Sequence, residues 1–226
     1  MTRPGGAGDG VDAGAVRDRV ASVRAQAAVL GHDHVAIVAV TKALGRGAMD
    51  AARLAGCDAV GENYAQELAA KLEAGPAGLP VHFIGRIQTN KVRLLSGSVD
   101  LWQSVDRDRV VDAIARECPP GVRVLIQVNA TGEPGKGGAA PRDVEALVER
   151  AVGAGLKVEG FMGVGPTSGD PAGTEAAFRV VRDLCDRFAF KVCSTGMSGD
   201  WRLALACGST MLRLGTALFG PRPGNR

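Results

Sequence analysis

Lys42 is the residue of this sequence whose type and position most clearly suggest chemistry. It follows Thr41 and the apolar run VAIVAV at 35–40, a pattern typical of a buried strand. At the end of such a strand the lysine stem is desolvated, and burial disfavours the ammonium form and leaves a more nucleophilic amine. Such an amine can form a Schiff base with an aldehyde. From position alone, a side chain that extends from the strand end into solvent is the more common outcome.

Two turns rich in glycine and hydroxyl residues lie near the C-terminus. The first is STGMSGD at 194–200, with Ser194, Gly196 and Ser198, and the second is Gly215-Thr216. Backbone N–H groups and hydroxyls in such turns can bind phosphate, although ordinary turn formation explains either turn alone equally well. The two turns together with a strand-end lysine indicate a ligand that carries both an aldehyde and a phosphate. Pyridoxal phosphate is the obvious member of that class.

Eight short apolar segments must position these residues, and we predict that they are strands. They are rich in Val, Ile and Leu and apolar on both faces, as in a parallel sheet covered by helices. Eight β/α units predict a single (β/α)8 TIM barrel. A doubly wound open sheet is the alternative, but no G-x-G-x-x-G motif joins a strand to a helix. The predicted strands are His34–Val40, Ala59–Gly61, Val81–Gly85, Leu101–Val105, Val122–Val128, Lys157–Gly163, Lys191–Ser194 and Leu212–Gly215.

Helical patterns alternate with these strands. An extra helix over Val11–Leu30 precedes the first strand, and the Gly-rich residues 1–10 are predicted to be a disordered tail. The barrel is therefore expected to span residues 11–226 as one domain. Asp106 and Thr174 are expected to cap the helices that follow them. The other predicted helices are Ala48–Ala55, Glu62–Ala74, Lys91–Leu95, Arg107–Glu117, Arg142–Ala154, Glu175–Phe188 and Asp200–Ala206.

Barrels of this kind carry their chemistry at the C-terminal ends of the strands. Tyr64, the only tyrosine, follows the second strand and can either stack on a ligand or simply pack. His82 lies inside the third strand, where a hydrogen-bonded structural histidine is expected rather than a catalytic one. The Gly-rich loop from Asn129 to Lys136 follows the fifth strand and is either a surface loop or part of the site.

Composition excludes several classes of protein. The 226 residues include 27 Lys and Arg against 24 Asp and Glu, and aromatic residues make up only 4%, so no nucleic-acid partner is expected. No apolar run is long enough to cross a membrane, and the N-terminus has no apolar signal segment. Five cysteines without a C-x-x-C pair predict reduced thiols in a cytoplasmic protein. No cluster has metal-ligand spacing, so no metal is expected.

The residues together carry a family resemblance. The chain resembles the pyridoxal phosphate homeostasis proteins, the YggS-like family, over nearly its whole length. GENY, H-F-I-G-x-x-Q-x-N-K and G-M-S-x-D together make the resemblance highly specific. The matching segments are AVTK (39–42), GENYAQE (61–67), HFIGRIQTNK (82–91), VDR (105–107), LIQVNATGEPGKGG (125–138), GFMGV (160–164), STGMSGD (194–200) and LRLGTALFGPR (212–222).

The resemblance implies an alanine-racemase-like barrel that holds pyridoxal phosphate covalently on Lys42. Asn63 and the backbone around Gly61 would line the cofactor ring, and Arg213 would approach the ring nitrogen or the phosphate. The sequence departs from the family pattern at Arg86, where proline is common, and at Gly199-Asp200-Trp201. The resemblance therefore does not define the residues at the rim of the site. The groups implied to hold the phosphate are Ser194, Gly196, Ser198, Gly215 and Thr216.

Three functions compete at this point. The family resemblance implies a protein that carries or buffers pyridoxal phosphate in vitamin B6 and amino- or keto-acid homeostasis. We expect that such a protein is not an efficient enzyme. A pyridoxal-phosphate-dependent amino-acid racemase is the alternative, but it needs a second acid/base group besides Lys42 and a second domain, for which we expect no room in the chain. An isomerase barrel without cofactor would need a glutamate base that only Glu62 offers. We expect a monomer whose further ligands are amino acids.

Overall fold

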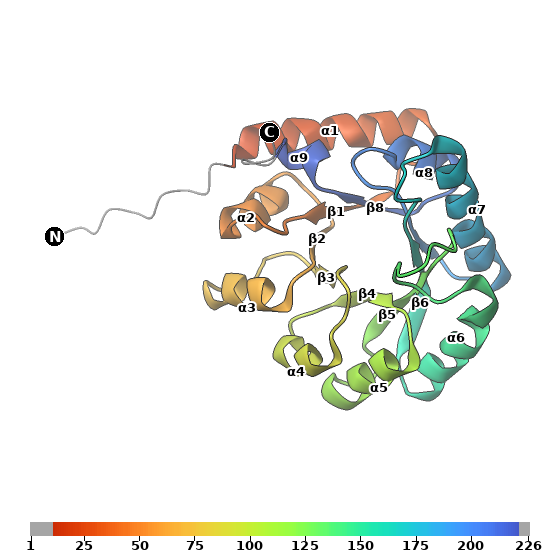
Figure 1. The fold of residues 1–226 in the computed structure, drawn as a ribbon. Helices are drawn as coiled ribbons and strands as arrows, with labels where there is room; N and C mark the ends of the chain where they lie inside the picture. The colour runs from red at the N-terminus through yellow and green to blue at the C-terminus, as the bar shows by residue number, and fades with distance from the viewer. Residues whose placement is uncertain (1–10, 222–226) are drawn as a thin grey trace.

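Eight parallel strands close into a barrel in which each strand pairs with its sequence neighbours and β8 returns to β1 (Figure 1). The structure is a computed structural model, and it describes residues 11–221. Every predicted strand is present, and the closed sheet confirms the (β/α)8 barrel over the open doubly wound sheet. The strands are β1 (Ala36–Val40), β2 (Ala59–Glu62), β3 (Val81–Phe83), β4 (Leu101–Val105), β5 (Arg123–Val128), β6 (Lys157–Gly163), β7 (Val192–Ser194) and β8 (Met211–Leu214).

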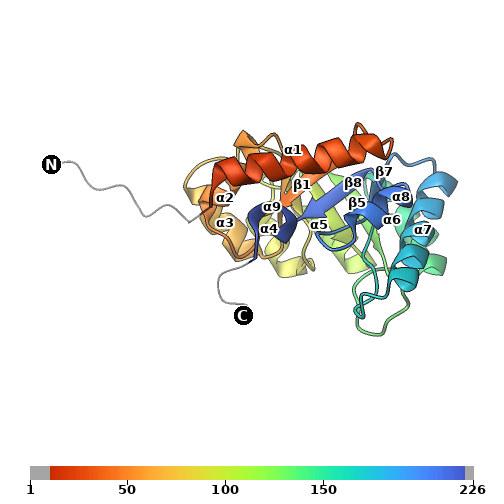
Figure 2. The ribbon, with the colours of Figure 1, turned by 90° about the horizontal axis from the view of Figure 1, so that it is seen from above.

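Helices surround the barrel, and the predicted extra helix α1 runs along one side of it (Figures 1 and 2). It packs against α2 and α9, so it covers the part of the wall formed by β1 and β8. Residues 1–10, the predicted disordered tail, lie outside the described residues. The helices are α1 (Ala13–Val29), α2 (Arg46–Leu54), α3 (Ala65–Glu73), η1 (Thr89–Lys91), α4 (Val92–Leu95), α5 (Asp108–Glu117), η2 (Pro141–Asp143), α6 (Val144–Gly153), α7 (Pro171–Arg187), α8 (Trp201–Ala206) and α9 (Thr216–Phe219).

Several helix starts differ from the predictions. Helix α3 begins at Ala65 because Glu62 belongs to β2. Helix α7 begins at Pro171 rather than Glu175, and Asp170 caps it by accepting a hydrogen bond from the Gly173 N–H at 2.6 Å. The residue that precedes α5 is Arg107, whose guanidinium pairs with Asp106, so Asp106 does not cap that helix. The short helix α9 was not predicted.

The core has two parts. A small cluster fills the barrel, and a much larger one lies between the strands and the helices. In the larger cluster Trp102 on β4 packs against Phe83 on β3 with ring centroids 5.4 Å apart. The described cysteines form no disulfide, and four of the five are buried. The side chains that fill the barrel are Val38, Ala59, Leu101, Leu125, Met162 and Met211.

Two further observations bear on function. Within residues 11–221, no helix combines the length and apolar character that a bilayer-spanning helix requires. In the same range, His, Cys, Asp and Glu side chains form no group of three that could hold a metal ion.

Candidate functional site

The C-terminal ends of β7, β8, β1 and β2 lie side by side at the mouth of the barrel, because these strands are consecutive in the closed sheet. The predicted residues come from these four ends. Lys42 follows β1 by two positions, Asn63 follows β2 directly, and Gly215 follows β8 directly. The fold therefore brings the predicted lysine and the predicted phosphate turns to one rim, which the sequence could only infer from the barrel hypothesis.

The turn that carries Lys42 is held on both sides. The Thr41 N–H donates to the Gly61 carbonyl at 3.0 Å, which ties the end of β1 to β2. Ala43 has a φ of 57°, in the left-handed region that non-glycine residues rarely occupy. Its N–H donates to the Glu67 carboxylate at 2.6 Å. Lys42 itself is partly exposed between these two anchors.

A second lysine, Lys71 on α3, forms hydrogen bonds with residues on both sides of this turn. Its buried ammonium donates to the Thr41 carbonyl at 2.8 Å, to Glu62 Oε1 at 2.6 Å and to Glu67 Oε1 at 2.6 Å. One ammonium thus contacts groups that hold the backbone immediately before and immediately after Lys42. We call Thr41, Glu62, Glu67 and Lys71 the ionic cluster. Its three hydrogen bonds use every proton that a lysine ammonium can donate.

Glu62 is the most buried member of the ionic cluster. Its side chain is fully buried, and Oε1 also accepts from the Thr41 hydroxyl at 2.6 Å. Burial raises the pKa of Glu62, while the hydrogen bonds from Lys71 and Thr41 oppose that rise. A buried carboxylate so paired is costly to leave without its partner. This places Glu62 as a support for the Lys42 turn and not as an exposed base at the mouth.

The two predicted phosphate turns are linked by a single hydroxyl. Ser198 Oγ accepts from the Gly215 N–H at 3.1 Å and from the Ala217 N–H at 3.0 Å. The turn after β7 requires glycine at position 196, which has a φ of 90° and where a Cβ atom would lie 2.5 Å from the Ala204 Cβ. Thr216 is exposed at the same place. The rim thus presents backbone N–H groups already directed at an oxygen acceptor.

Ser194 and Arg213 lie deeper than the turns. Ser194 is fully buried, and its hydroxyl donates to Gln103 Oε1 at 2.8 Å and accepts from Arg213 Nη1 at 2.6 Å. Arg213 also donates to the carbonyls of Ser194 and Gly163, at 2.7 and 2.8 Å. Burial lowers the pKa of Arg213 to about 10. These partners are within the protein, so the contacts favour a supporting role beneath the mouth for both side chains.

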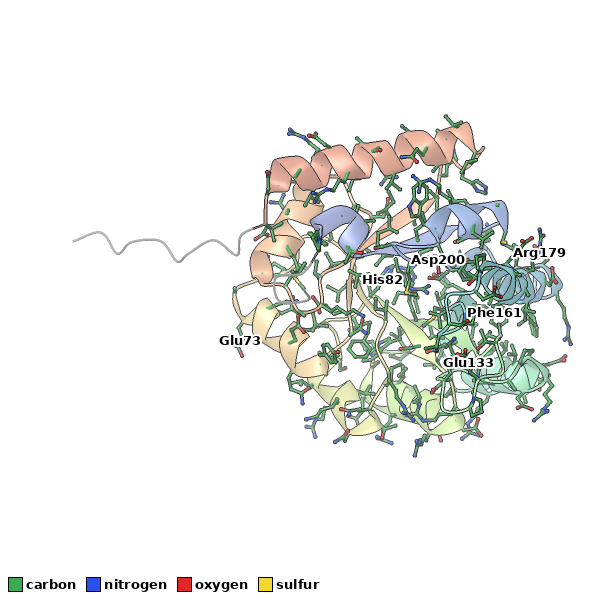
Figure 3. All side chains as sticks on the ribbon, turned by 45° about the horizontal axis from the view of Figure 1, so that its top comes forward. Glu73, His82, Glu133, Phe161, Arg179 and Asp200 are labelled. Atoms are coloured by element: carbon green, nitrogen blue, oxygen red, sulfur yellow. The ribbon has the colours of Figure 1, made fainter. Side chains whose placement is uncertain are left out.

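His82 completes this polar layer inside the barrel. Its Nδ1 lies 2.9 Å from Gln103 Nε2, and burial lowers the pKa of the imidazole to about 4. A neutral, hydrogen-bonded histidine at the barrel centre (Figure 3) confirms the structural interpretation. The loop from Asn129 to Lys136 is also tied down, since Lys136 donates to Glu133 at 2.8 Å and Glu133 accepts from the Thr167 N–H at 3.0 Å.

Asn63 lies where the second and third strand ends meet. The backbone of Gly85 approaches it so closely that a Cβ atom on residue 85 would lie 2.1 Å from the Asn63 carbonyl oxygen. This contact requires glycine and joins the GENY and HFIG segments. Asn63 Oδ1 is buried and has no hydrogen-bond partner among the described residues.

Sequence reasoning missed the ionic cluster. Glu67 and Lys71 have the i,i+4 spacing of an ordinary surface ion pair on a helix. Only the fold shows that both face the end of β1. In the sequence, the residue that could have indicated this cluster is Glu62. Its carboxylate directly follows the apolar residues of β2 and therefore needs a buried partner.

Comparison with known proteins agrees with this geometry. A family model, the alanine racemase N-terminal domain, matches residues 11–223. A pyridoxal phosphate homeostasis protein of Pseudomonas aeruginosa is 37% identical over 212 residues, 89% of this chain and 92% of that protein. A crystal structure of an unknown protein from Bifidobacterium adolescentis superposes with a TM-score of 0.84 at 30% identity, over 92% of this chain and 95% of that one.

A third similar protein is PipY of Synechococcus elongatus, whose structure was solved with PLP bound. It superposes with a TM-score of 0.75 at 30% identity, over 91% of this chain and 100% of that one. The matches cover the barrel from α1 to the last described residues. The chain therefore belongs to the pyridoxal phosphate homeostasis protein family, whose fold is that of the alanine racemase N-terminal domain.

Proposed function

We propose that this protein binds pyridoxal phosphate at the mouth of the barrel, covalently on Lys42, and carries or buffers the cofactor in vitamin B6 homeostasis. The observation that carries the proposal is the position of Lys42 on the same rim as the turns after β7 and β8. Family membership supports it, since relatives bear the name of homeostasis proteins and PipY was solved with PLP bound.

The residues present fit the cofactor. The Gly215 and Ala217 N–H groups point at one oxygen acceptor, the Ser198 hydroxyl, and a phosphate oxygen has the same acceptor chemistry. The turn at Gly215 is not crowded, because a Cβ atom built there would make only ordinary van der Waals contact with Val40, at 3.7 Å. When bound, pyridoxal phosphate supplies an aldehyde that forms an imine with an amine. Lys42 supplies that amine.

Each group then has a distinct task. Ser198, Gly215 and Thr216, with the turn at Gly196, bind the phosphate, and Asn63 lines the ring. Lys71, Glu62 and Glu67 orient the turn that presents the Lys42 amine. Ser194 and Arg213 support the turn after β7 from inside the barrel through the Ser194 carbonyl. This assigns the phosphate to groups at the rim and not to the Ser194 hydroxyl.

Two observations favour a carrier over a racemase. Tyr64, the only tyrosine of the chain, is 58% exposed, and its hydroxyl forms no hydrogen bond with any described residue. It is therefore a poor candidate for the second proton-transfer group that racemisation needs. The Arg213 guanidinium is used by Ser194 and Gly163, so it is not available for proton transfer either.

The experiment combines transfer and turnover. Protein loaded with pyridoxal phosphate and dialysed is mixed with the apo form of a pyridoxal-phosphate enzyme, and recovery of that enzyme's activity is followed against Lys42→Ala as control. A carrier restores activity, whereas failure to bind or release the cofactor contradicts the proposal.

Amino acids are the further ligands that we propose for this site. Loaded protein is incubated with L-amino acids in deuterated water, and exchange at Cα is measured. We expect changes in the visible spectrum with negligible exchange. Exchange at about 1 s⁻¹ or faster, the low end of ordinary enzymes, favours the racemase alternative.

A further inference from the structure

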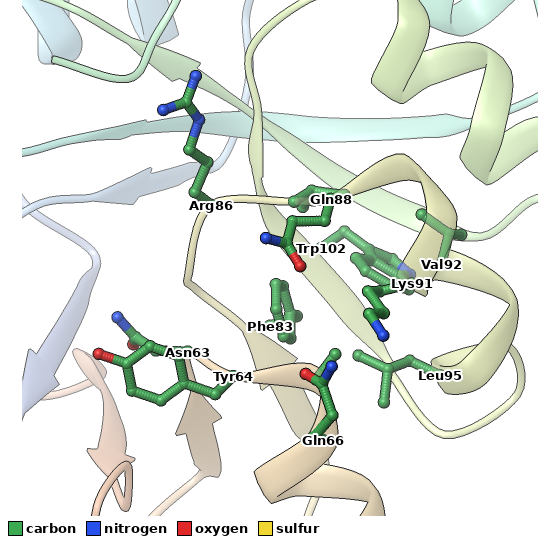
Figure 4. Close-up of a pocket in the computed structure, with 12 residues that line it drawn as sticks. Asn63, Tyr64, Gln66, Phe83, Arg86, Gln88, Lys91, Val92, Leu95 and Trp102 are labelled. Carbon is green, nitrogen blue, oxygen red and sulfur yellow. The ribbon is translucent and has the colours of Figure 1, made fainter. Parts of the chain in front are cut away.

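A cavity of about 330 Å³ lies outside the barrel wall, between α3 and α4. We call it the side cavity (Figure 4). Its apolar surface includes Phe83 from β3, Trp102 from β4 and Leu95 from α4, and Gln66 and Lys91 line its edge. Of the residues predicted for the cofactor, it shares only Asn63. The side cavity is therefore a separate feature of the fold from the mouth.

Trp102, which lines this cavity, carries a buried donor without a partner. Trp102 is 1% exposed, and its indole Nε1 forms no hydrogen bond with any described residue. A buried N–H group that lacks an acceptor costs free energy, and native structures contain few of them. An acceptor supplied by a ligand would remove that cost. Asn63 Oδ1, also unpartnered, lies at another edge of the same cavity.

Unpaired positive charge borders the cavity. Within residues 11–221, the Lys91 ammonium and the Arg86 guanidinium form no hydrogen bond or ion pair, whereas many other cations of the described chain pair with carboxylates. None of the residues that line the cavity is acidic. In Figure 4 the Lys91 side chain lies beside Trp102, with its ammonium directed toward Leu95 and Gln66. The field at this edge therefore favours an anion.

From these contacts we propose that the side cavity binds a small organic carboxylate with an aromatic or branched apolar body. The carboxylate pairs with Lys91, and a small shift of the buried Trp102 indole brings Nε1 within its reach. The apolar body packs on Phe83 and Leu95. A volume of about 330 Å³ lies at the small end of ligand pockets, which fits a single-ring acid rather than a nucleotide.

The indole N–H signal of Trp102 reports on this site directly. The chain has two tryptophans, so ¹⁵N-labelled full-length protein is expected to give two indole signals, which Trp201→Phe assigns. If that variant does not fold, Trp102→Phe makes the same assignment by loss of the other signal. The probe is 3-phenylpropionate, its uncharged counterpart is 3-phenylpropanamide, and phenyl phosphate tests the other common anion.

We expect 3-phenylpropionate to shift the Trp102 signal saturably, with affinity at least about tenfold above that of the amide. Lys91→Met removes this preference, whereas Arg93→Met, which removes a cation two residues further along in α4 and outside the cavity, leaves it unchanged. No shift at millimolar acid, equal affinity for acid and amide, or an unchanged preference in Lys91→Met overturns the proposal. Tighter binding of phenyl phosphate overturns the choice of carboxylate.

Discussion

Two polar regions border helix α3, and they differ in whether their lysine has hydrogen-bond partners within the protein. In the ionic cluster, every proton of the Lys71 ammonium is donated to an oxygen of the protein. In the side cavity, Lys91 has no partner among the described residues, and a buried indole N–H has none either. The two lysines therefore have different roles. Lys71 holds the fold in one shape, whereas Lys91 is available to a ligand.

The largest effect is expected from breaking the ionic cluster. Lys71→Met leaves Glu62 fully buried without its cation, and removing one partner of a buried pair typically costs about 3–5 kcal/mol. The free energy of unfolding, measured in urea at neutral pH, should fall by this amount. Lys191→Met, at an exposed lysine, is the control. The double variant Lys71→Met/Glu62→Gln should recover part of the loss. A loss below about 1 kcal/mol in Lys71→Met would contradict the supporting role.

A smaller effect is expected at the rim, where the exposed Thr216 lies between two backbone N–H groups that donate to Ser198 Oγ. Thr216→Val removes a donor to phosphate, and a charge-assisted hydrogen bond is worth about 1.5–3 kcal/mol, or roughly ten- to a hundredfold in affinity. Titration should show weaker binding of pyridoxal phosphate and unchanged binding of unphosphorylated pyridoxal. Equal weakening of both ligands would place the phosphate elsewhere.

Protonation offers a test of the buried polar layer inside the barrel. Burial lowers the pKa of His82 to about 4, whereas an unfolded histidine titrates near 6.5. Between these values the unfolded chain binds a proton that the folded chain does not, so stability falls as pH falls. From about pH 6.5 to about pH 5 this amounts to about 1.6 kcal/mol. Urea unfolding of the wild type and of His82→Gln over this range measures it, and parallel pH dependences of the two proteins would refute it.

The smallest effect is expected in the side cavity. Lys91→Met should change the free energy of unfolding by less than about 0.5 kcal/mol, because the ammonium forms no ion pair within residues 11–221. The same urea titration measures this variant beside Lys71→Met. A loss comparable to that of Lys71→Met would mean that Lys91 is structural, and the contrast between the two regions would disappear.

Much of the fold could be predicted because each strand is an apolar segment bounded by polar turns. The apolar segments VAIVAV at 35–40 and VRVLIQV at 122–128 contain β1 and β5, as expected for strands buried on both faces. The start of α3 could not be predicted, because Glu62 is polar and resembles a helix residue until its buried partner Lys71 is known. Helix α9 was missed because four residues are too few to show a helical period.

Residues of the candidate site could be predicted only where the local sequence of one strand end or turn was enough to identify them. Lys42 and Gly196 follow from strand ends and turn chemistry, and the structure places both at the rim. The side cavity is instead lined by residues of separate segments, among them Gln66 of α3, Leu95 of α4 and Trp102 of β4. The burial of Ser194 likewise depends on Gln103 and Arg213, from two other strands. Contacts of this kind exist only after the barrel closes.

The most direct test of the central claim is to identify the amine that holds the cofactor. Protein saturated with pyridoxal phosphate is reduced with borohydride, digested, and analysed by mass spectrometry, with Lys71→Arg and Lys91→Met treated in parallel. The account predicts that the reduced adduct lies on the peptide containing Lys42 in all three proteins, and that Lys42→Ala loses both the adduct and the visible absorption band. An adduct on another lysine, or a Lys42→Ala protein that keeps the band after dialysis, would contradict it.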